Sequence, residues 1–253
     1  MVKKIGKGSL ALEFALFYFL FFNFTLSGMR QSIAMSFLTV ALFEILDGRK
    51  KKALLLTIIA QLFHASVILI VILILICFFI NNSKRKRMWI SLFVIGLIMI
   101  IFAFSFYAGK IADFVGIINP RYKYFIWHYL HSGFNFEDVP STDIVVKSIL
   151  VFMPLWLASR KKYVSDIDKL MLMFTLLGRY FVLFNGVFYE SMRIAYYFDY
   201  FIIFYVPRSL ISIRNRTNRL SYKLIYICLA VTYWLYFIMH IGGYGTNIVT
   251  FNI

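Results

Sequence analysis

A block of 28 residues, from Ala53 to Ile80, contains no Asp, Glu, Lys or Arg. About 20 predominantly apolar residues are enough to cross a bilayer as a helix, and this block is only the longest of several apolar stretches in the chain. Apolar and aromatic residues make up 62% of the 253 residues and charged residues only 15%, against about 25% in ordinary soluble domains. The sequence therefore predicts an integral membrane protein and excludes soluble enzymes and disordered chains.

The remaining apolar stretches predict about seven full membrane-spanning helices. The expected spans are Ser9–Ser27, Gln31–Leu46, Trp89–Tyr107, Ile144–Ala158, Leu170–Phe188, Ile194–Val206 and Leu224–Ile241. The chain has no internal repeat and no Pro- or Gly-rich linker, so we expect one domain over residues 1–253. The predicted fold is an all-α, polytopic bundle of membrane helices around an outward-facing cavity.

The length of the Ala53–Ile80 block determines the predicted topology. As one straight helix it would be about 42 Å long, and it would have to tilt by roughly 45° to fit the hydrocarbon core. Basic clusters at Arg49–Lys52 and Lys84–Arg87 flank it, and basic residues accumulate on the cytoplasmic face. We therefore predict a re-entrant hairpin, or two short spans, turning near His64. The N-terminus is then cytoplasmic and the C-terminus outside.

The charge balance and the absence of known motifs limit the partners and cofactors that the sequence predicts. The net charge of +16 is explained by basic cytoplasmic loops, so we predict no nucleic-acid partner. His128 and His131 have no third ligand nearby, so we predict no metal site. The sequence has no phosphate-binding loop and no dinucleotide fingerprint. We expect no cofactor, and the energy for any reaction must come from the substrate or from a gradient.

Residues 108–143 form the one large extramembrane segment, which the topology places on the outer face. The segment is rich in aromatic residues, at Tyr122, Tyr124, Phe125, Trp127, Tyr129, Phe134 and Phe136. These residues are typical of an interfacial helix in the aromatic belt of a membrane protein. Alternatively, they form a platform on which sugar rings stack.

Seven basic residues lie away from the predicted cytoplasmic face: Arg30, Lys110, Arg121, Lys123, Lys147, Arg179 and Arg193. Arg179 falls in the middle of a span, where an arginine costs about 2.5–3.5 kcal/mol and marks a functional candidate. Either it is buried in a pair with a carboxylate, or it binds substrate. Arg30 and Arg193 lie at outer helix ends, where snorkelling is the ordinary alternative. Together, the three arginines would suit an anionic substrate that bears phosphate.

His64 and two carboxylates complete the set of candidate site residues. His64 is the only histidine inside an apolar block, at the expected turn. It is either a core histidine bonded to a backbone carbonyl, or an outward-facing general base or phosphate contact. Glu190 and Asp199 are the carboxylates nearest to Arg193 in the sequence, and at least one of them could simply neutralise an arginine.

Three short motifs resemble the EpsG family of bacterial exopolysaccharide proteins. The first is an Arg-Gln pair followed by small residues, in Ser27–Ala34 (SGMRQSIA). The second, about 30 residues later, is a histidine followed by small residues, in Ala60–Ser66 (AQLFHAS). The third is an Arg-x-x-x-Tyr-Phe pattern, in Arg193–Phe198. The resemblance covers the chain from about residue 10. Because family members usually carry additional N-terminal spans, the resemblance implies a short or N-terminally truncated member.

The resemblance implies a role in making exopolysaccharide, capsule or biofilm matrix. The family is related in role to Wzy-type polymerases, which join oligosaccharide repeat units carried on undecaprenyl diphosphate at the outer face of the bacterial plasma membrane. No nucleotide is needed, since the lipid diphosphate is the leaving group. The implied partners are the lipid-linked glycan, membrane lipid and other polysaccharide-assembly proteins.

We therefore expect a polytopic glycosyltransferase that polymerises lipid-linked repeat units. The expected catalytic residues are Arg30, His64 and Arg193. The expected substrate-binding residues are Gln31, Arg179, Glu190, Tyr197 and Asp199. Two alternatives remain open: a transporter or flippase of lipid-linked sugars that uses the same cationic cavity, and a non-catalytic assembly partner.

Overall fold

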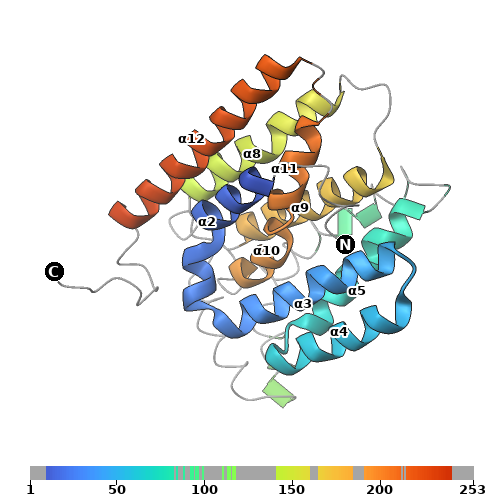
Figure 1. Ribbon diagram of the computed structural model, residues 1–253. Coiled ribbons are helices and arrows are strands. Elements are labelled where there is room, and N and C mark those ends of the chain that lie inside the picture. Colours follow the sequence, from blue (N-terminus) through green and yellow to red (C-terminus); the bar gives the residue numbers. More distant parts are fainter. Residues whose placement is uncertain are drawn as a thin grey trace.

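The computed structural model describes residues 10–82, 141–159, 165–184, 191–211, 213 and 215–240, together with residues 84, 88, 92–93, 95–96, 99, 110, 113–114 and 116–117. The regular elements within these residues are all helices (Figure 1). They are α2 (Leu10–Ser27), α3 (Met29–Leu46), α4 (Lys50–Phe63), α5 (Val67–Asn82), α8 (Ser141–Ser159), α9 (Asp166–Phe184), α10 (Ser191–Asp199), α11 (Ile202–Leu210) and α12 (Arg216–His240). The predicted all-α class is confirmed for this part of the chain.

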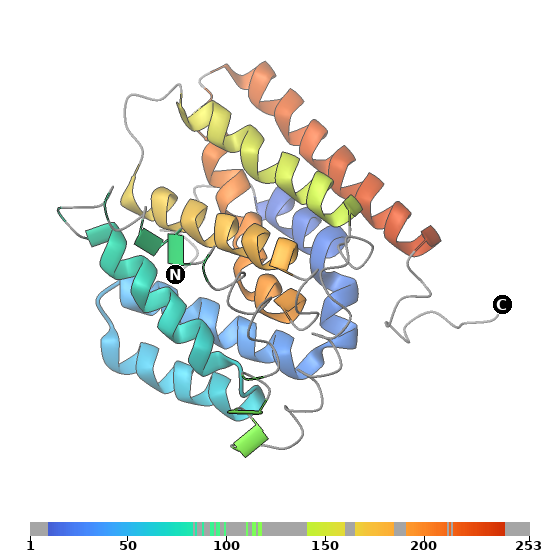
Figure 2. The same cartoon turned by 180° about the vertical axis from the view of Figure 1, so that it is seen from behind.

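The helices form two groups, each with its own apolar core (Figures 1 and 2). One core joins α3, α4, α5, α9 and α10. The other core joins α2, α8, α11 and α12. The rings of Tyr196, Tyr200 and Phe204 pack against both cores. The segment that carries these rings, α10 and the start of α11, is therefore the seam between the two groups.

The chain turns at His64, as the sequence predicted. Helix α4 ends at Phe63, and α5 begins at Val67. His64 has an extended backbone (φ −152°, ψ 122°), which stops the helix, and its carbonyl accepts a 3.2 Å hydrogen bond from the backbone N–H of Val67. At 1.5 Å per residue, α4 and α5 are about 21 and 24 Å long. Each is shorter than the hydrocarbon core of about 30 Å.

Helices α3 and α4 pack closely because small residues lie between them. The buried residues of α4 are Ala53 and Ala60, and small side chains let helix backbones approach one another in membrane proteins. The turn between the two helices contains Gly48 at φ +80°, a left-handed conformation that glycine adopts without steric cost. The turn is therefore tight enough to make α3 and α4 neighbours (Figure 1).

The outside of the bundle is apolar. On α4, Leu54, Ile58 and Leu62 lie one turn apart and are 62%, 52% and 81% exposed, and α5 exposes a comparable set of Ile, Leu and Phe side chains. Exposed apolar faces of this extent are typical of helices in contact with lipid. Within the described residues, Met29–Leu46 and Arg216–Met239 are long and apolar enough to cross a membrane, and three shorter helices are also apolar.

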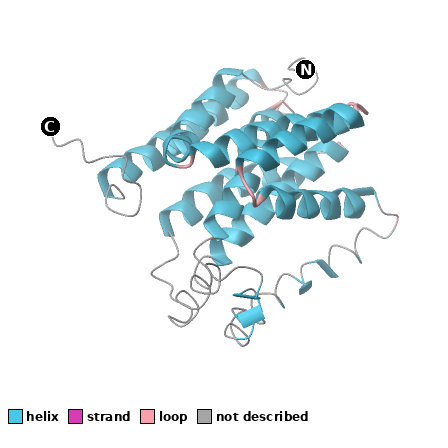
Figure 3. Ribbon diagram, turned by 90° about the horizontal axis from the view of Figure 1, so that it is seen from below, coloured by secondary structure: helices cyan, strands magenta, loops and turns pink. Residues whose placement is uncertain are grey.

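The number of spans and the orientation of the termini stay predictions. Most of the expected span Trp89–Tyr107 and most of the aromatic segment 108–143 lie outside the described residues, which Figure 3 draws in colour.

The expected span Ile194–Val206 is not one helix, and this prediction is wrong. The structure has two nine-residue helices, α10 and α11, joined at Tyr200 and Phe201. At the junction the backbone N–H groups of Phe201 and Ile203 donate three residues back, at 3.1 and 3.2 Å, which is the tighter 3₁₀ pattern. No glycine or proline stands at the junction, so the local sequence contains no signal for the break.

Candidate functional site

Helix α10 carries three of the eight expected site residues, Arg193, Tyr197 and Asp199, and it contacts the start of α3 and the α4–α5 connection. Gln31, in the first turn of α3, donates a hydrogen bond from its side-chain amide to the backbone carbonyl of Arg193. His64, between α4 and α5, contacts Tyr197. The start of α3, the α4–α5 connection and α10 therefore meet at one end of the bundle, called here the His64 end.

His64, Ser66 and Tyr197 form a small polar cluster at the His64 end. The Nδ1 atom of His64 lies 2.6 Å from the Ser66 hydroxyl oxygen and 3.2 Å from the Tyr197 hydroxyl oxygen. The Ser66 hydroxyl also donates to the Tyr197 hydroxyl at 3.3 Å. Because both partners meet Nδ1, they fix the orientation of the imidazole ring.

The electrostatic surroundings of His64 favour its neutral form. Half-burial in the α4–α5 connection lowers the pKa of His64 below its ordinary value of 6.5, and the positive charge of Arg193 lowers this pKa further. A neutral imidazole can accept a proton at neutral pH, which an imidazolium cannot do. The arrangement is therefore suited to general-base chemistry.

Arg30 and Arg193 are both exposed at the His64 end. Arg30 lies in the first turn of α3, next to Gln31, and Arg193 lies in the first turn of α10. The hydrogen bond from Gln31 to the carbonyl of Arg193 holds these two helix starts together. Because the first turn of a helix is also its positive end, both arginines and both helix dipoles favour an anion at this end.

Arg179 and Asp199 lie in a different environment, a buried ionic cluster. The Nε atom of Arg179 donates to Asp199 Oδ1 at 3.0 Å, and a second guanidinium nitrogen pairs with Oδ2. The Nζ atom of Lys147, on α8, lies 3.9 Å from the same Oδ2. The side chains of Lys147 and Asp199 are 0% and 1% exposed, and that of Arg179 is 7% exposed. One buried carboxylate therefore lies between two cations from different helices.

Aromatic rings surround the ammonium group of Lys147. Its Nζ atom is 5.1 Å from the ring centroids of Phe21 and Tyr196 and 5.3 Å from that of Tyr233. Distances within about 6 Å allow cation–π attraction, which strengthens where water is excluded. Since Phe21, Tyr196 and Tyr233 belong to α2, α10 and α12, Lys147 links four helices through one charge.

Gly178 makes room for the Asp199 carboxylate. A Cβ atom at position 178 would lie 2.8 Å from the backbone nitrogen of Asp199 and closer still to its carboxylate. The backbone nitrogen belongs to the main chain of α10, which cannot move aside easily. Only glycine therefore lets α9 and α10 approach closely enough for Arg179, one residue later, to reach Asp199.

The structure brings together some of the expected site residues and separates others. Four of the catalytic and substrate-binding candidates meet at the His64 end: Gln31, His64, Arg193 and Tyr197. Arg179 is held by Asp199 in the buried cluster, which is the carboxylate-pair alternative for this arginine. Arg30 is exposed on α3 beside Gln31. Glu190 lies outside the described residues.

Two residues of the site had no role in the sequence interpretation. Ser66 stands only two residues after His64, so its proximity was a usable signal. The sequence places Lys147 away from the predicted cytoplasmic face but does not indicate its role. Its partner Asp199 is 52 positions away in the chain, so sequence spacing gives no sign of the pair. Among the described residues, no three His, Cys, Asp or Glu side chains lie close enough to hold a metal ion; the expectation of no metal cofactor stays a prediction.

A comparison with known protein families places the sequence. The EpsG family profile matches residues 1–252, essentially the whole chain. The chain belongs to the EpsG family. The resemblance seen in the Arg-Gln, histidine and Arg-x-x-x-Tyr-Phe motifs is thus confirmed, and all three motifs of this EpsG protein meet at the His64 end.

Family membership assigns this EpsG protein to exopolysaccharide biosynthesis at a membrane. No curated protein and no solved structure matches the chain. The roles of individual residues must therefore be argued from their geometry.

The buried cluster predicts a large stability difference between two Asp→Asn substitutions. Asp199→Asn removes the negative charge between Arg179 and Lys147 and leaves both cations buried, which should lower the free energy of unfolding by about 3–5 kcal/mol. Asp166→Asn is the matched control, because Asp166 pairs with Lys169 at 3.0 Å on the exposed surface, where such a pair contributes about 0–1 kcal/mol.

Denaturant unfolding of the purified variants in detergent measures both values. Equal stability of the two variants would contradict the structural role of Asp199.

Proposed function

We propose that this EpsG protein polymerises an exopolysaccharide by joining oligosaccharide units carried on a polyprenyl diphosphate. The observation that carries the proposal is the meeting of a histidine, oriented by two hydroxyls, with exposed arginines at one end of a membrane bundle. A neutral imidazole suits deprotonation of a sugar hydroxyl, and guanidinium groups suit a diphosphate. Family membership supplies the setting, exopolysaccharide biosynthesis at a membrane.

The reaction is a glycosyl transfer that needs no nucleotide. A hydroxyl oxygen of the acceptor unit attacks the anomeric carbon that links the growing glycan to its lipid diphosphate. The new C–O glycosidic bond forms as the bond between the anomeric carbon and the diphosphate oxygen breaks. The hydroxyl proton passes to His64, and the polyprenyl diphosphate leaves with the electron pair of the broken bond.

In this proposal, the proton of the neutral His64 ring is on Nδ1. If Nδ1–H donates to the Ser66 hydroxyl, 2.6 Å away, the lone pair that accepts the proton is on Nε2. Ser66 in turn donates to the Tyr197 hydroxyl, so the three residues form a chain that holds the base in one tautomer. Ser66 and Tyr197 are thus positioning residues for His64.

Arg30 and Arg193 provide the charge that the leaving diphosphate requires. As the anomeric bond breaks, negative charge grows on the diphosphate, and cations fixed near it lower the barrier. Removal of one fixed donor of this kind typically raises the barrier by about 2.7–4 kcal/mol. Arg193 has a second effect, because its charge adds to the effect of burial in lowering the pKa of His64.

Arg179, Asp199 and Lys147 contribute by holding α10 in place. Asp199 ends the helix that presents Arg193 and Tyr197, and its two cationic partners come from α8 and α9. A shift of α10 would separate Tyr197 from His64, which lie 3.2 Å apart. In this proposal, Arg179 acts through Asp199 on the position of α10.

Substitutions at the His64 end should shorten the glycan. In cells that depend on this chain, Arg30→Ala or His64→Ala should reduce the polymer to single units and short oligomers, since a loss of about 2.7–4 kcal/mol corresponds to a rate about 100- to 1,000-fold lower. Arg216→Ala, at an exposed arginine that begins α12, is the control and should leave chain length unchanged.

Gel analysis of surface glycan at matched protein levels gives the readout. Wild-type chain length in both the Arg30 and the His64 variants would remove the catalytic assignment.

The coupling between Arg193 and His64 predicts a shift in the pH profile. Elongation by the wild-type protein should fall as the pH drops through the pKa of His64, with a midpoint below 6.5, because the protonated ring cannot act as a base. Arg193→Gln removes a positive charge that lowers this pKa, so its midpoint should move upward. Arg216→Gln should not move it.

The measurement is the rate of elongation by purified protein between about pH 5 and pH 8. The midpoint is the readout, because Arg193→Gln also lowers the absolute rate. Identical midpoints in the wild-type and Arg193→Gln proteins would contradict the assignment of His64 as the base.

Transport of a lipid-linked sugar is a second candidate, and one structural feature favours it. Interrupted helices are common around the substrate sites of transporters, and within the described residues the helices are interrupted at His64 and at Tyr200–Phe201. The two functions differ in where substrate accumulates. Loss of a transporter leaves lipid-linked units on the cytoplasmic side, whereas loss of a polymerase leaves single units displayed outside.

A further inference from the structure

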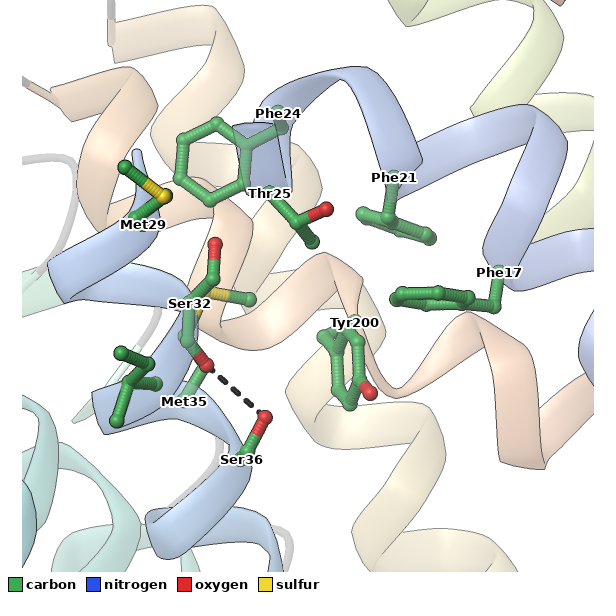
Figure 4. Close-up of a pocket in the computed structure, with 10 residues that line it drawn as sticks. Phe17, Phe21, Phe24, Thr25, Met29, Ser32, Met35, Ser36 and Tyr200 are labelled. Carbon is green, nitrogen blue, oxygen red and sulfur yellow. Dashed lines mark hydrogen bonds between the residues drawn. The ribbon is translucent and has the colours of Figure 1, made fainter. Parts of the chain in front are cut away.

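A cavity of about 330 Å³ lies between α2 and α3, outside the cluster around His64. Figure 4 shows phenylalanines of α2 on one side of it, residues of α3 on the other, and Tyr200 between them. The lining residues are Phe17, Phe21, Phe24, Thr25, Met29, Ser32, Ile33, Met35, Ser36 and Tyr200. The volume lies at the lower end of the range of about 300–1,000 Å³ that is typical of ligand sites.

The lining of the cavity suits a hydrocarbon chain. Most of its side chains are aromatic or aliphatic, and aromatic faces pack well against methyl-branched, unsaturated chains. Met29 and Ile33, at its edge, are 66% and 39% exposed, so the cavity opens onto the apolar exterior of the bundle. A lipid chain can therefore enter from the membrane without crossing a polar surface.

The cavity also begins beside the cationic site. Met29 lines it, and the next residue is Arg30, in the same first turn of α3. The Phe24 ring, which forms part of the opposite wall, stacks on Tyr196 of α10 with 3.9 Å between ring centroids. A headgroup held by Arg30 and Arg193 would thus have an apolar channel directly next to it.

The Oγ atom of Ser32, which lines the cavity, lacks a hydrogen-bond partner among the described residues. This atom is buried. The hydroxyls of Thr25 and Ser36, by contrast, bond to backbone carbonyls. Ser32 lies one turn after Met29. A buried hydroxyl so close to the helix start is placed to donate to an oxygen at the head of a bound chain.

We infer that this cavity binds the isoprene units nearest to the headgroup of a polyprenyl diphosphate, whose diphosphate lies at Arg30 and Arg193. The inference rests on the proposed function. In that function, the substrate carries a long branched chain on a diphosphate that is held at the His64 end. It adds a site in α2 and α3 that holds the lipid carrier while the sugar chemistry takes place at α10. Ser32 marks the boundary between headgroup and chain.

Binding of defined probes to the purified full-length protein tests this assignment. The probes are undecaprenyl diphosphate without sugar, inorganic diphosphate without lipid, and phosphatidylglycerol. Ser32→Trp fills the cavity, and Met29→Trp blocks its exposed mouth with little risk to folding. Thr232→Trp is the matched control, because Thr232 is an exposed residue of α12 away from the cavity.

We expect both cavity variants to bind undecaprenyl diphosphate at least about tenfold more weakly than the wild-type or Thr232→Trp protein. Their affinity for inorganic diphosphate should stay the same, because the arginines are untouched. Wild-type affinity for undecaprenyl diphosphate in the Met29→Trp protein would overturn the assignment. So would equally tight, Met29-dependent binding of phosphatidylglycerol, which would make the cavity a general lipid site.

The outcome is separable from that of the polymerase proposal. Cavity-dependent binding together with normal glycan length in the Arg30 and His64 variants would retain the lipid site and remove the polymerase. Shortened glycan in those variants together with unchanged binding in the cavity variants would retain the polymerase and remove the lipid site.

Discussion

The packing of α8, α9 and α10 depends on the buried carboxylate of Asp199. Asp199 lies between the guanidinium of Arg179 and the ammonium of Lys147, and the three side chains are almost inaccessible to solvent. Each charge alone would be very costly in an apolar bundle, but together they are tolerated because each has a partner. Since Arg179, Lys147 and Asp199 come from α9, α8 and α10, the requirement for charge pairing sets the relative positions of three helices. The cluster also lies where the two apolar cores meet.

The positions of the site residues along the rest of α10 follow from this constraint. A nine-residue helix is about 13 Å long, so fixing its last residue also fixes Arg193 and Tyr197. Tyr197 then meets His64 and Ser66, and the carbonyl of Arg193 meets Gln31. Phe24 stacks on Tyr196, which places the wall of the α2–α3 cavity against the same helix. Base, cations and apolar cavity are therefore arranged around one short element.

The sequence predicted the features that depend on local length and charge. The Ala53–Ile80 block was too long for one span and was flanked by like charges. Its length and its flanking charges together therefore predicted the break at His64. The partners of charged residues were not predictable in the same way. Lys147 and Asp199 are far apart in the chain, and the split between α10 and α11 has no glycine or proline to mark it. These features arise from tertiary packing, which a single sequence does not encode locally.

The most direct test of the central claim is elongation by the purified protein alone. The full-length chain in lipid nanodiscs would receive a polyprenyl-diphosphate-linked repeat unit, with no nucleotide and no gradient, and products would be separated by size. The account predicts a ladder of longer lipid-linked glycans and the release of one polyprenyl diphosphate for each bond formed. Substrate that remains as single units, under conditions where the folded protein binds it, would contradict the account.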